Sequence, residues 1–222
     1  DATRALLLQF PHLAVHNLHH NALPVAEQAI ALLLAACKFV VPMDRALRAG
    51  DWTPRYRPSP SLLVQGRLAL VLGYGAIGRH VARLCRGLGM EVVAVRRRPT
   101  GTEAGIDQLH DLLPRAGVVL VCLPLTPETE GLLGAAELAL LPPEAVLVNV
   151  ARGPIVDEAA LFEALRERRL YAAGLDVWWD YPPDEEGRSH TPPSRYPFHE
   201  LDNVVMSPHR AASSTETERL RV

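Results

Sequence analysis

The amino-acid sequence predicts an α/β domain in which helices flank a doubly wound parallel sheet. Short apolar runs alternate with amphipathic segments of helical periodicity along most of the chain, as they do in parallel α/β sheets. The run 117–122 (GVVLVC) is apolar throughout, which is typical of a parallel strand covered on both faces. A glycine-rich turn, Gly73 to Gly78, joins a strand-like run to a helix-like segment, and this order favours the same fold.

The composition narrows the classes of protein to which the chain can belong. Its 222 residues allow one large or two small domains, and 48% of them are hydrophobic. The net charge of -2 gives no electrostatic reason to expect a nucleic acid or an anionic membrane as a partner. No signal peptide is visible, and the longest apolar run, 29–41, is too short to span a bilayer. An odd number of cysteines, spread through apolar runs, suits reduced thiols in a cytoplasmic protein: Cys37, Cys85 and Cys122.

A long helix is expected over residues 24–41. Most of it is apolar on nearly all sides, which is typical of a helix between domains or in a subunit interface. Pro42 is expected to kink or end this helix, and a second short helix is expected over 43–49. Residues 51–61 contain three prolines and are expected to form an extended crossing segment.

The remaining segments supply the rest of the sheet and its helices. A long polar, proline-rich loop is expected over 178–202, and Ser213 and Glu216 resemble a capping box that opens a terminal helix. Strands are expected before Gly73 and at 91–95, 117–122, 145–150, 171–175 and 203–206, with helices at 76–88, 106–113, 130–141 and 157–168.

The glycine turn indicates a dinucleotide-binding βαβ unit of the Rossmann type over residues 67–99. Gly73 permits a tight turn after the strand, Gly75 lets the backbone approach a pyrophosphate, and Gly78 lets the helix pack on the sheet. Ala76 and Ile77 begin the helix, whose N-terminal N–H groups face the phosphates.

Polar residues that follow three later strands suggest hydride transfer beside this dinucleotide. Arg152 follows the strand 145–150, Asp176 follows 171–175, and His209 follows 203–206, so all three converge at the carboxyl edge of the sheet. An arginine can bind a carboxylate, and a histidine can carry a proton near neutral pH. Adjacent His19 and His20 have no other ligand at a suitable spacing, so we expect no metal site.

The chain resembles the D-isomer-specific 2-hydroxyacid dehydrogenase family in the stretches VAEQAIALLL, GYGAIG, CLPLTPETEGLL, VNVARGPIVDEAAL, AAGLDVW and MSPH, which follow the family's order. The resemblance implies reduction of a small 2-oxo acid such as glyoxylate or hydroxypyruvate. Arg152 would bind and polarise the substrate, His209 would act as acid/base, and Asp176 would hold the nicotinamide carboxamide. Other cofactor-lining residues would be Pro124, Thr129, Val150 and Ala151. The long apolar helix would take part in a homodimer.

The resemblance also implies a separate substrate domain, most of which is absent from this sequence. Residues 1–23 would be a remnant of that domain or a linker, 24–210 the NAD(P)-binding Rossmann domain, and 211–222 the start of a truncated helix. The chain begins at Asp1 without a methionine and ends a few residues into the expected helix. We therefore expect a piece of a longer protein that binds cofactor but turns over poorly alone.

The end of the second strand departs from the pattern of the NAD-preferring members. Eighteen residues after Gly78, where those members carry an acidic residue, the chain has Arg96, followed by Arg97 and Arg98. An arginine cannot accept a hydrogen bond from the ribose 2′-OH but can pair with a 2′-phosphate. We expect a preference for NADP(H), with NAD(H) possible; the alternative is a solvated basic turn.

A second departure concerns the partner of the catalytic histidine. The family's glutamate five residues after the aspartate is replaced by Tyr181, with Asp180, Asp184 and Glu185 as other candidates. The DVW sequence and the non-acidic partner leave a formate dehydrogenase-like enzyme as one alternative. A cofactor-sensing, corepressor-like interaction module is another, because the same family includes such proteins.

Overall fold

Seven strands form one parallel sheet in the computed structural model, which describes residues 6, 9–10, 12 and 19–219. The strands lie in the order β3-β2-β1-β4-β5-β6-β7, and every neighbouring pair is parallel. The expected doubly wound sheet is therefore confirmed. Its strands are β1 Leu68–Leu72, β2 Glu91–Arg96, β3 Ala104–Gly105, β4 Val118–Val121, β5 Val146–Asn149, β6 Ala172–Leu175 and β7 Val204–Met206.

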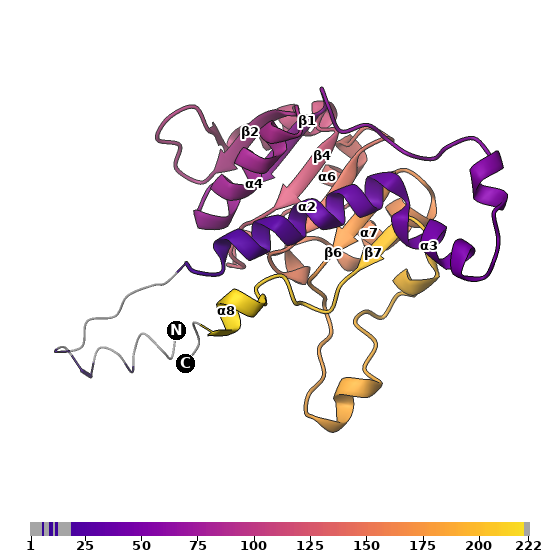
Figure 1. Ribbon diagram of the computed structural model, residues 1–222. Helices are drawn as coiled ribbons and strands as arrows, with labels where there is room; N and C mark the ends of the chain where they lie inside the picture. The colour runs from indigo at the N-terminus through magenta and orange to yellow at the C-terminus, as the bar shows by residue number, and fades with distance from the viewer. Residues whose placement is uncertain (1–5, 7–8, 11, 13–18, 220–222) are drawn as a thin grey trace.

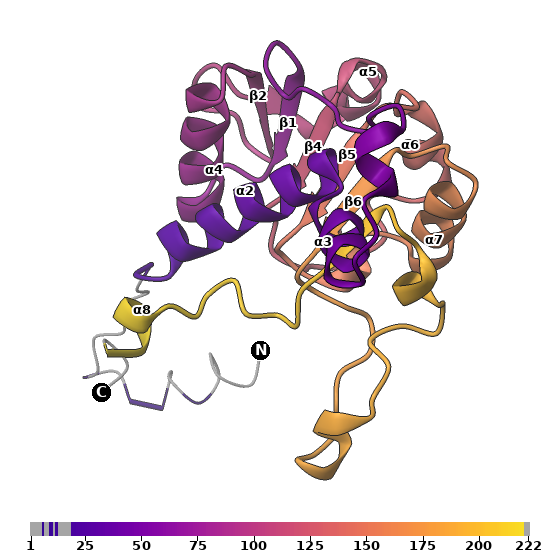
Figure 2. The same ribbon diagram turned by 45° about the vertical axis from the view of Figure 1, so that its right-hand side comes forward.

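Helices cover both faces of this sheet (Figures 1 and 2). Alternate residues of β1 point to opposite faces: Ala69 and Val71 join the core beneath α2 and α4, whereas Leu70 and Leu72 join the core beneath α5, α6 and α7. The helices are α2 Ala22–Lys38, α3 Val40–Arg48, α4 Ala76–Gly87, α5 Leu109–Leu112, α6 Ala135–Leu140, α7 Glu158–Arg166 and α8 Thr215–Arg219.

The direction of the chain across the sheet reverses beside β1. The chain first passes from β1 outward to β2 and β3, then returns to the other side of β1 to form β4. Where the strand order reverses in this way, the loops after the two neighbouring strands run in opposite directions. They leave a crevice between them at the carboxyl ends of the strands. The glycine turn after β1 and the loop 122–129 after β4 border this crevice.

The break in the long N-terminal helix lies three residues before the expected position. Phe39, with φ 52°, separates α2 from α3, and the two helices bend by 65° there. Pro42 instead lies in the first turn of α3, where its missing N–H has no helical partner to lose. Phe39 is buried edge-on against Tyr171, so tertiary packing fixes the break. Within the described residues, no single helix is long and apolar enough to cross a membrane.

Several other element boundaries differ from the expectations. The short strand β3 was not predicted, and the helix expected over 130–141 begins only at Ala135, where Glu137 accepts a hydrogen bond from the Gly134 N–H. The terminal capping box lies one residue later than expected: the Ser214 and Thr217 hydroxyls each accept the other's backbone N–H, at 3.1 and 2.8 Å. These shifts reflect local hydrogen bonds that periodicity does not reveal.

Both ends of the expected domain division reach beyond the described residues. Most of the predicted remnant 1–23 lies outside the described residues, as do residues 220–222 of the predicted truncated helix.

The proline-rich loop after β6 is an arm that projects from the sheet and carries a short 3-10 helix, Glu186–Ser189 (Figures 1 and 2). Its base is fastened by the buried carboxylate of Glu158, which accepts hydrogen bonds from Ser194 and from the Arg195 backbone.

Candidate active site

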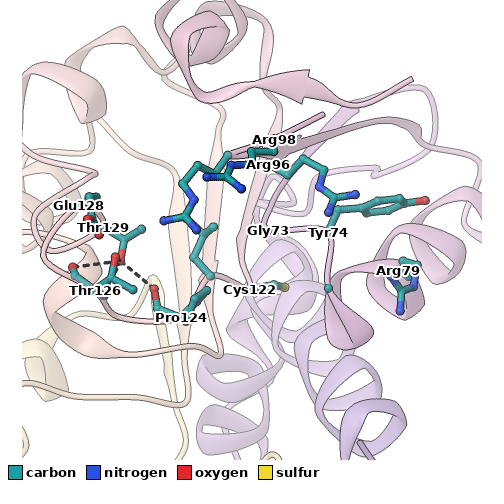
Figure 3. A pocket seen from close by; sticks show the side chains of 13 residues that line it. Gly73, Tyr74, Arg79, Arg96, Arg98, Cys122, Pro124, Thr126, Glu128 and Thr129 are labelled. Carbon is teal, nitrogen blue, oxygen red and sulfur yellow. Dashed lines mark hydrogen bonds between the residues drawn. The ribbon is translucent and has the colours of Figure 1, made fainter. Parts of the chain in front are cut away.

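A trough formed by two adjoining pockets runs along the carboxyl edge of the sheet. The first pocket, about 450 Å³, and the second, about 570 Å³, share Gly75 and the segment 122–124 as walls. The first extends to Arg96, the last residue of β2, and to Arg97 and Arg98 after it. Figure 3 labels Arg96 and Arg98 among the residues that line this pocket. The second extends past the start of α4 to Val150, Ala151 and Arg152 beyond β5. The structure thus brings most of the predicted cofactor-binding residues to one surface.

Backbone conformation and packing require glycine at two of the three positions in the turn, but not at the third. Gly73 has φ 95°, and a Cβ at Gly78 would lie 1.9 Å from the Gly73 carbonyl oxygen, so neither position accepts a side chain without a shift. Gly75 has an extended backbone, and a Cβ there would have no protein atom within 4 Å. Packing therefore explains Gly73 and Gly78 but not Gly75, which lines both pockets. A dinucleotide phosphate at the N-terminus of α4 fits this pattern.

The loop after β4 is braced by Thr129. Its hydroxyl donates to the Pro124 carbonyl at 2.7 Å and accepts from the Thr126 N–H at 2.8 Å (Figure 3). Pro124 lines both pockets, whereas Thr129 lines only the wall of the first. The Thr129 side chain therefore shapes this wall through the loop that it holds.

The three arginines are not equivalent. Arg96 Nη1 donates to Glu103 Oε1 at 3.2 Å and to Thr100 Oγ1 at 3.1 Å. Backbone N–H groups of this loop, that of Thr100 first, lower the pKa of the Glu103 carboxyl, and the Arg96 guanidinium adds to the effect. The Arg96 side chain thus stabilises the loop 96–103 by hydrogen bonds, while Arg97 and Arg98 line the same pocket.

Arg152 is exposed at the end of β5, and Asn149 fixes its backbone. The Asn149 side chain is buried; its Oδ1 accepts the Ala151 N–H at 3.0 Å and its Nδ2 donates to the Arg152 carbonyl at 2.9 Å. Sequence reasoning missed this residue. The only signal was a polar residue inside an otherwise apolar strand.

Asp176 is fully buried, and its carboxylate is directed at the segment that carries His209. Oδ1 accepts the Ser207 hydroxyl at 2.5 Å and the Arg210 N–H at 3.0 Å, while Oδ2 accepts the Ala211 N–H at 2.9 Å. These donors come from both sides of His209. The contact with a nicotinamide carboxamide stays a prediction.

His209 is exposed and has a left-handed backbone, with φ 56°. Its Nδ1 lies 2.9 Å from the Tyr181 phenol oxygen, which also accepts the Trp178 N–H at 3.1 Å. Of the other candidates for this position, Asp184 accepts the Gly187 N–H and Glu185 pairs with Arg188. Asp180 precedes Tyr181 in the chain, and within the described residues no hydrogen bond joins its carboxylate to His209. The histidine therefore has a tyrosine partner where the resemblance implied a carboxylate.

Arg152 and His209 follow strands that are separated by one strand. The register aligns the strand ends, because Asn149 of β5 pairs with Leu175 of β6, which pairs with Met206 of β7. Asp176 follows the middle strand. The Arg152 guanidinium, the buried Asp176 carboxylate and the His209 imidazole thus follow three adjacent strands along the edge of the sheet beside the trough. Within the described residues, no three His, Cys, Asp or Glu side chains form a metal-binding group.

Comparisons with known proteins agree with these features. The sequence model of the family described as "D-isomer specific 2-hydroxyacid dehydrogenase, NAD binding domain" matches residues 30–211. A glyoxylate reductase from Korarchaeum cryptofilum is 38% identical over 86% of this chain, and a D-3-phosphoglycerate dehydrogenase from Archaeoglobus fulgidus is 36% identical over 89%. The matches cover 57% and 36% of the respective relatives.

A solved structure extends the likeness to three dimensions. The NADPH-dependent glyoxylate/hydroxypyruvate reductase from Sinorhizobium meliloti, in complex with NADP and malonate, has a TM-score of 0.80 and 30% identity. The match covers 98% of this chain and 65% of that one. The chain therefore spans between about a third and two thirds of the length of the relatives it matches.

Proposed function

The chain belongs to the D-isomer specific 2-hydroxyacid dehydrogenase family, and we propose that it is the cofactor-binding part of an enzyme that interconverts a small 2-oxo acid and its 2-hydroxy acid. The observation that carries the proposal is the trough that passes from an unobstructed Gly75 to Arg152. His209 follows β7, which lies two strands from β5, at the same edge of the sheet. Glyoxylate and hydroxypyruvate are the first substrates to test, because similar proteins are named for them.

The residues divide the chemistry of 2-oxo acid reduction between them. The bound nicotinamide would supply the hydride that the carbonyl carbon accepts. Arg152 would bind the carboxylate and polarise the carbonyl oxygen, since a guanidinium matches the geometry of a carboxylate. His209, as an imidazolium, would give its Nε2 proton to the oxygen of the new alcohol. The Tyr181 oxygen, 2.9 Å from Nδ1, would accept the other N–H and so hold the ring in its donating orientation.

We also propose that the cofactor is NADP(H) in preference to NAD(H). β2 ends in an arginine and not in an acidic residue, and three consecutive arginines, 96–98, line the end of the trough beside β2. Because Arg96 is engaged with Glu103, Arg97 and Arg98 are the residues assigned to a 2′-phosphate. A phosphate monoester has acceptor oxygens enough for two guanidinium groups.

The proposed assembly is a homodimer that involves α2. One side of this helix packs on the sheet, and Ile30 and Leu34 lie partly buried at the margin of that core. Leu23 and Ala31 on the other side are exposed, with the charged Glu27 between them. Partly exposed apolar residues on a surface helix are typical of a protein interface.

The test of the enzyme function uses the full-length protein encoded by the gene that contains this sequence. Oxidation of NADPH and NADH is followed with a panel of 2-oxo acids, and Arg152→Gln and His209→Gln are expected to abolish turnover while cofactor binding persists. Arg115→Gln, an exposed arginine away from the trough, serves as the matched control. Tight cofactor binding without turnover across the panel would refute the enzyme and favour a cofactor-sensing module. The 222-residue chain alone is expected to bind cofactor and to turn over poorly.

A further inference from the structure

We infer that Asp176, Ser207 and Gln28 form a hydrogen-bonded chain that positions His209, so that Asp176 is a positioning residue for the acid/base. The inference rests on the proposed function only in giving His209 a catalytic task. The connection itself consists of contacts between side chains of α2, the end of β6 and the segment after β7.

The backbone of His209 requires external support. Its φ of 56° lies in the left-handed region. Residues other than glycine adopt this backbone conformation at an energetic cost and keep it only when the surrounding structure enforces it. The Asp176 carboxylate accepts the backbone N–H groups of Arg210 and Ala211 at 3.0 and 2.9 Å. These bonds fix the backbone immediately after His209.

Ser207 fixes the backbone before His209 and connects three elements. Its hydroxyl donates to Asp176 Oδ1 at 2.5 Å and accepts from Gln28 Nε2 at 3.3 Å, and its carbonyl accepts the Trp178 indole N–H at 2.9 Å. Only the serine hydroxyl can donate to the carboxylate and accept from the amide at once. Ser207 therefore relays the position of α2 to the histidine.

The charge of Asp176 is satisfied by this arrangement. The side chain is fully buried, and a buried carboxylate is stable only with several donors. Among the described residues, the three donors that contact it belong to residues 207–211. The main consequence of losing Asp176 would therefore fall on the His209 segment, and a reduced affinity for the cofactor would be secondary.

The experiment compares variants of the full-length protein in kcat, KM for the oxo acid, and Kd for NADPH. Ser207→Ala and Asp176→Asn are expected to lower kcat about ten- to a hundredfold, the loss typical of a misplaced catalytic group, while Kd for NADPH stays within about twofold. Ser207→Thr keeps the hydroxyl and should restore most of kcat. Ser189→Ala, an exposed serine of the arm, is the matched control.

The coupling to α2 has its own test. Gln28→Ala should lower kcat severalfold, and should add nothing in a Ser207→Ala background, because both changes break the same chain. Additive effects would overturn the relay. A weaker Kd for NADPH in Asp176→Asn with unchanged kcat would overturn the positioning role and assign Asp176 to the cofactor instead.

A spectroscopic readout separates this inference from the proposed function. The ring signals of His209 in the NMR spectrum, identified by their loss in His209→Gln, should move in Ser207→Ala and Asp176→Asn but not in Ser189→Ala. Unchanged signals would refute the positioning chain even in an active enzyme. Shifted signals would support the chain even if the protein proved inactive on every oxo acid, which would refute the proposed function alone.

Discussion

The phenol oxygen of Tyr181 lies 2.9 Å from Nδ1 of His209 and also accepts the Trp178 N–H. A phenol is a hydrogen-bonding partner that offers a hydroxyl, whereas a carboxylate offers a negative charge. It can therefore orient the imidazole but cannot stabilise the imidazolium as strongly as a carboxylate at the same place would. This contact determines how the proposed reaction should depend on pH.

Tyr181→Glu is expected to extend reduction of the oxo acid to higher pH. A carboxylate beside Nδ1 favours the protonated ring that reduction requires, so the alkaline fall in kcat/KM should move up by about one pH unit or more. The comparison is a pH-rate profile of the full-length protein and its variant. Tyr181→Phe, which removes only the hydroxyl, should lower kcat without this upward movement. Superimposable profiles for tyrosine and glutamate would contradict the assigned contact.

Gly75→Ala and Gly78→Ala should separate cofactor binding from folding. A methyl group at Gly78 would lie 1.9 Å from the Gly73 oxygen, and such overpacking costs about 1–3 kcal/mol of unfolding free energy. At Gly75 the methyl group meets no protein atom within 4 Å, so stability should change by less than about 1 kcal/mol. Affinity for the dinucleotide should nonetheless fall, because Gly75 lines both pockets of the trough. Urea unfolding and cofactor titration measure the two effects, and intact cofactor affinity in a folded Gly75→Ala protein would contradict the assigned phosphate position.

Arg97→Gln should weaken NADPH binding but leave NADH binding nearly unchanged. A charge-assisted hydrogen bond to a phosphate contributes about 1.5–3 kcal/mol, which corresponds to roughly a ten- to hundredfold increase in Kd. Calorimetry with both cofactors on the same protein gives the ratio directly. Arg115→Gln provides the control for a lost positive charge away from the trough. An equal loss for both cofactors would mean that Arg97 does not read the 2′-phosphate.

The buried thiols should lower stability at alkaline pH. Burial raises the pKa of Cys37 and of Cys85 to about 11, from 9.0 for an unburied thiol. Between these values the unfolded chain has released protons that the folded chain still holds, so the free energy of unfolding falls as pH rises. Each thiol should contribute up to about 1.4 kcal/mol per pH unit.

Urea midpoints measured from about pH 8 to about pH 11 test this linkage. Wild type should lose stability faster with rising pH than Cys37→Ala or Cys85→Ala, even though each substitution also leaves a small cavity. The comparison of slopes removes the constant cost of that cavity. Equal slopes in all three proteins would show that these thiols ionise alike in the folded and unfolded states.

Ala31→Arg should dissociate the proposed homodimer. Ala31 lies on the exposed side of α2, where a long charged side chain would be buried without a partner in an interface. Sedimentation velocity at several concentrations gives the oligomeric state. Ala139→Arg, at an exposed site of α6, should leave it unchanged. A dimer that survives the α2 substitution would exclude this face as the interface.

The sequence predicted the sheet because its signals are local. A run such as 117–122 is apolar throughout because it is covered on both faces, and the turn itself favours glycine at 73 through its φ of 95° and at 78 through the Gly73 carbonyl. Periodicity failed where distant contacts decide the backbone. The helix break lies at Phe39 because this side chain packs on Tyr171, and no neighbour of Phe39 in the sequence signals that contact.

The sequence by itself determined at which strand ends the residues of the proposed site lie: the glycine turn, the three arginines, Arg152, Asp176, Tyr181 and His209 all follow strands or a motif that periodicity locates. Only the tertiary structure decided their partners. Arg96 is bound to Glu103, His209 to Tyr181, and Asp176 to the segment 207–211. The physical reason is that a strand pattern gives the edge at which a side chain emerges, whereas a hydrogen bond depends on ångström-scale distances between segments far apart in the chain.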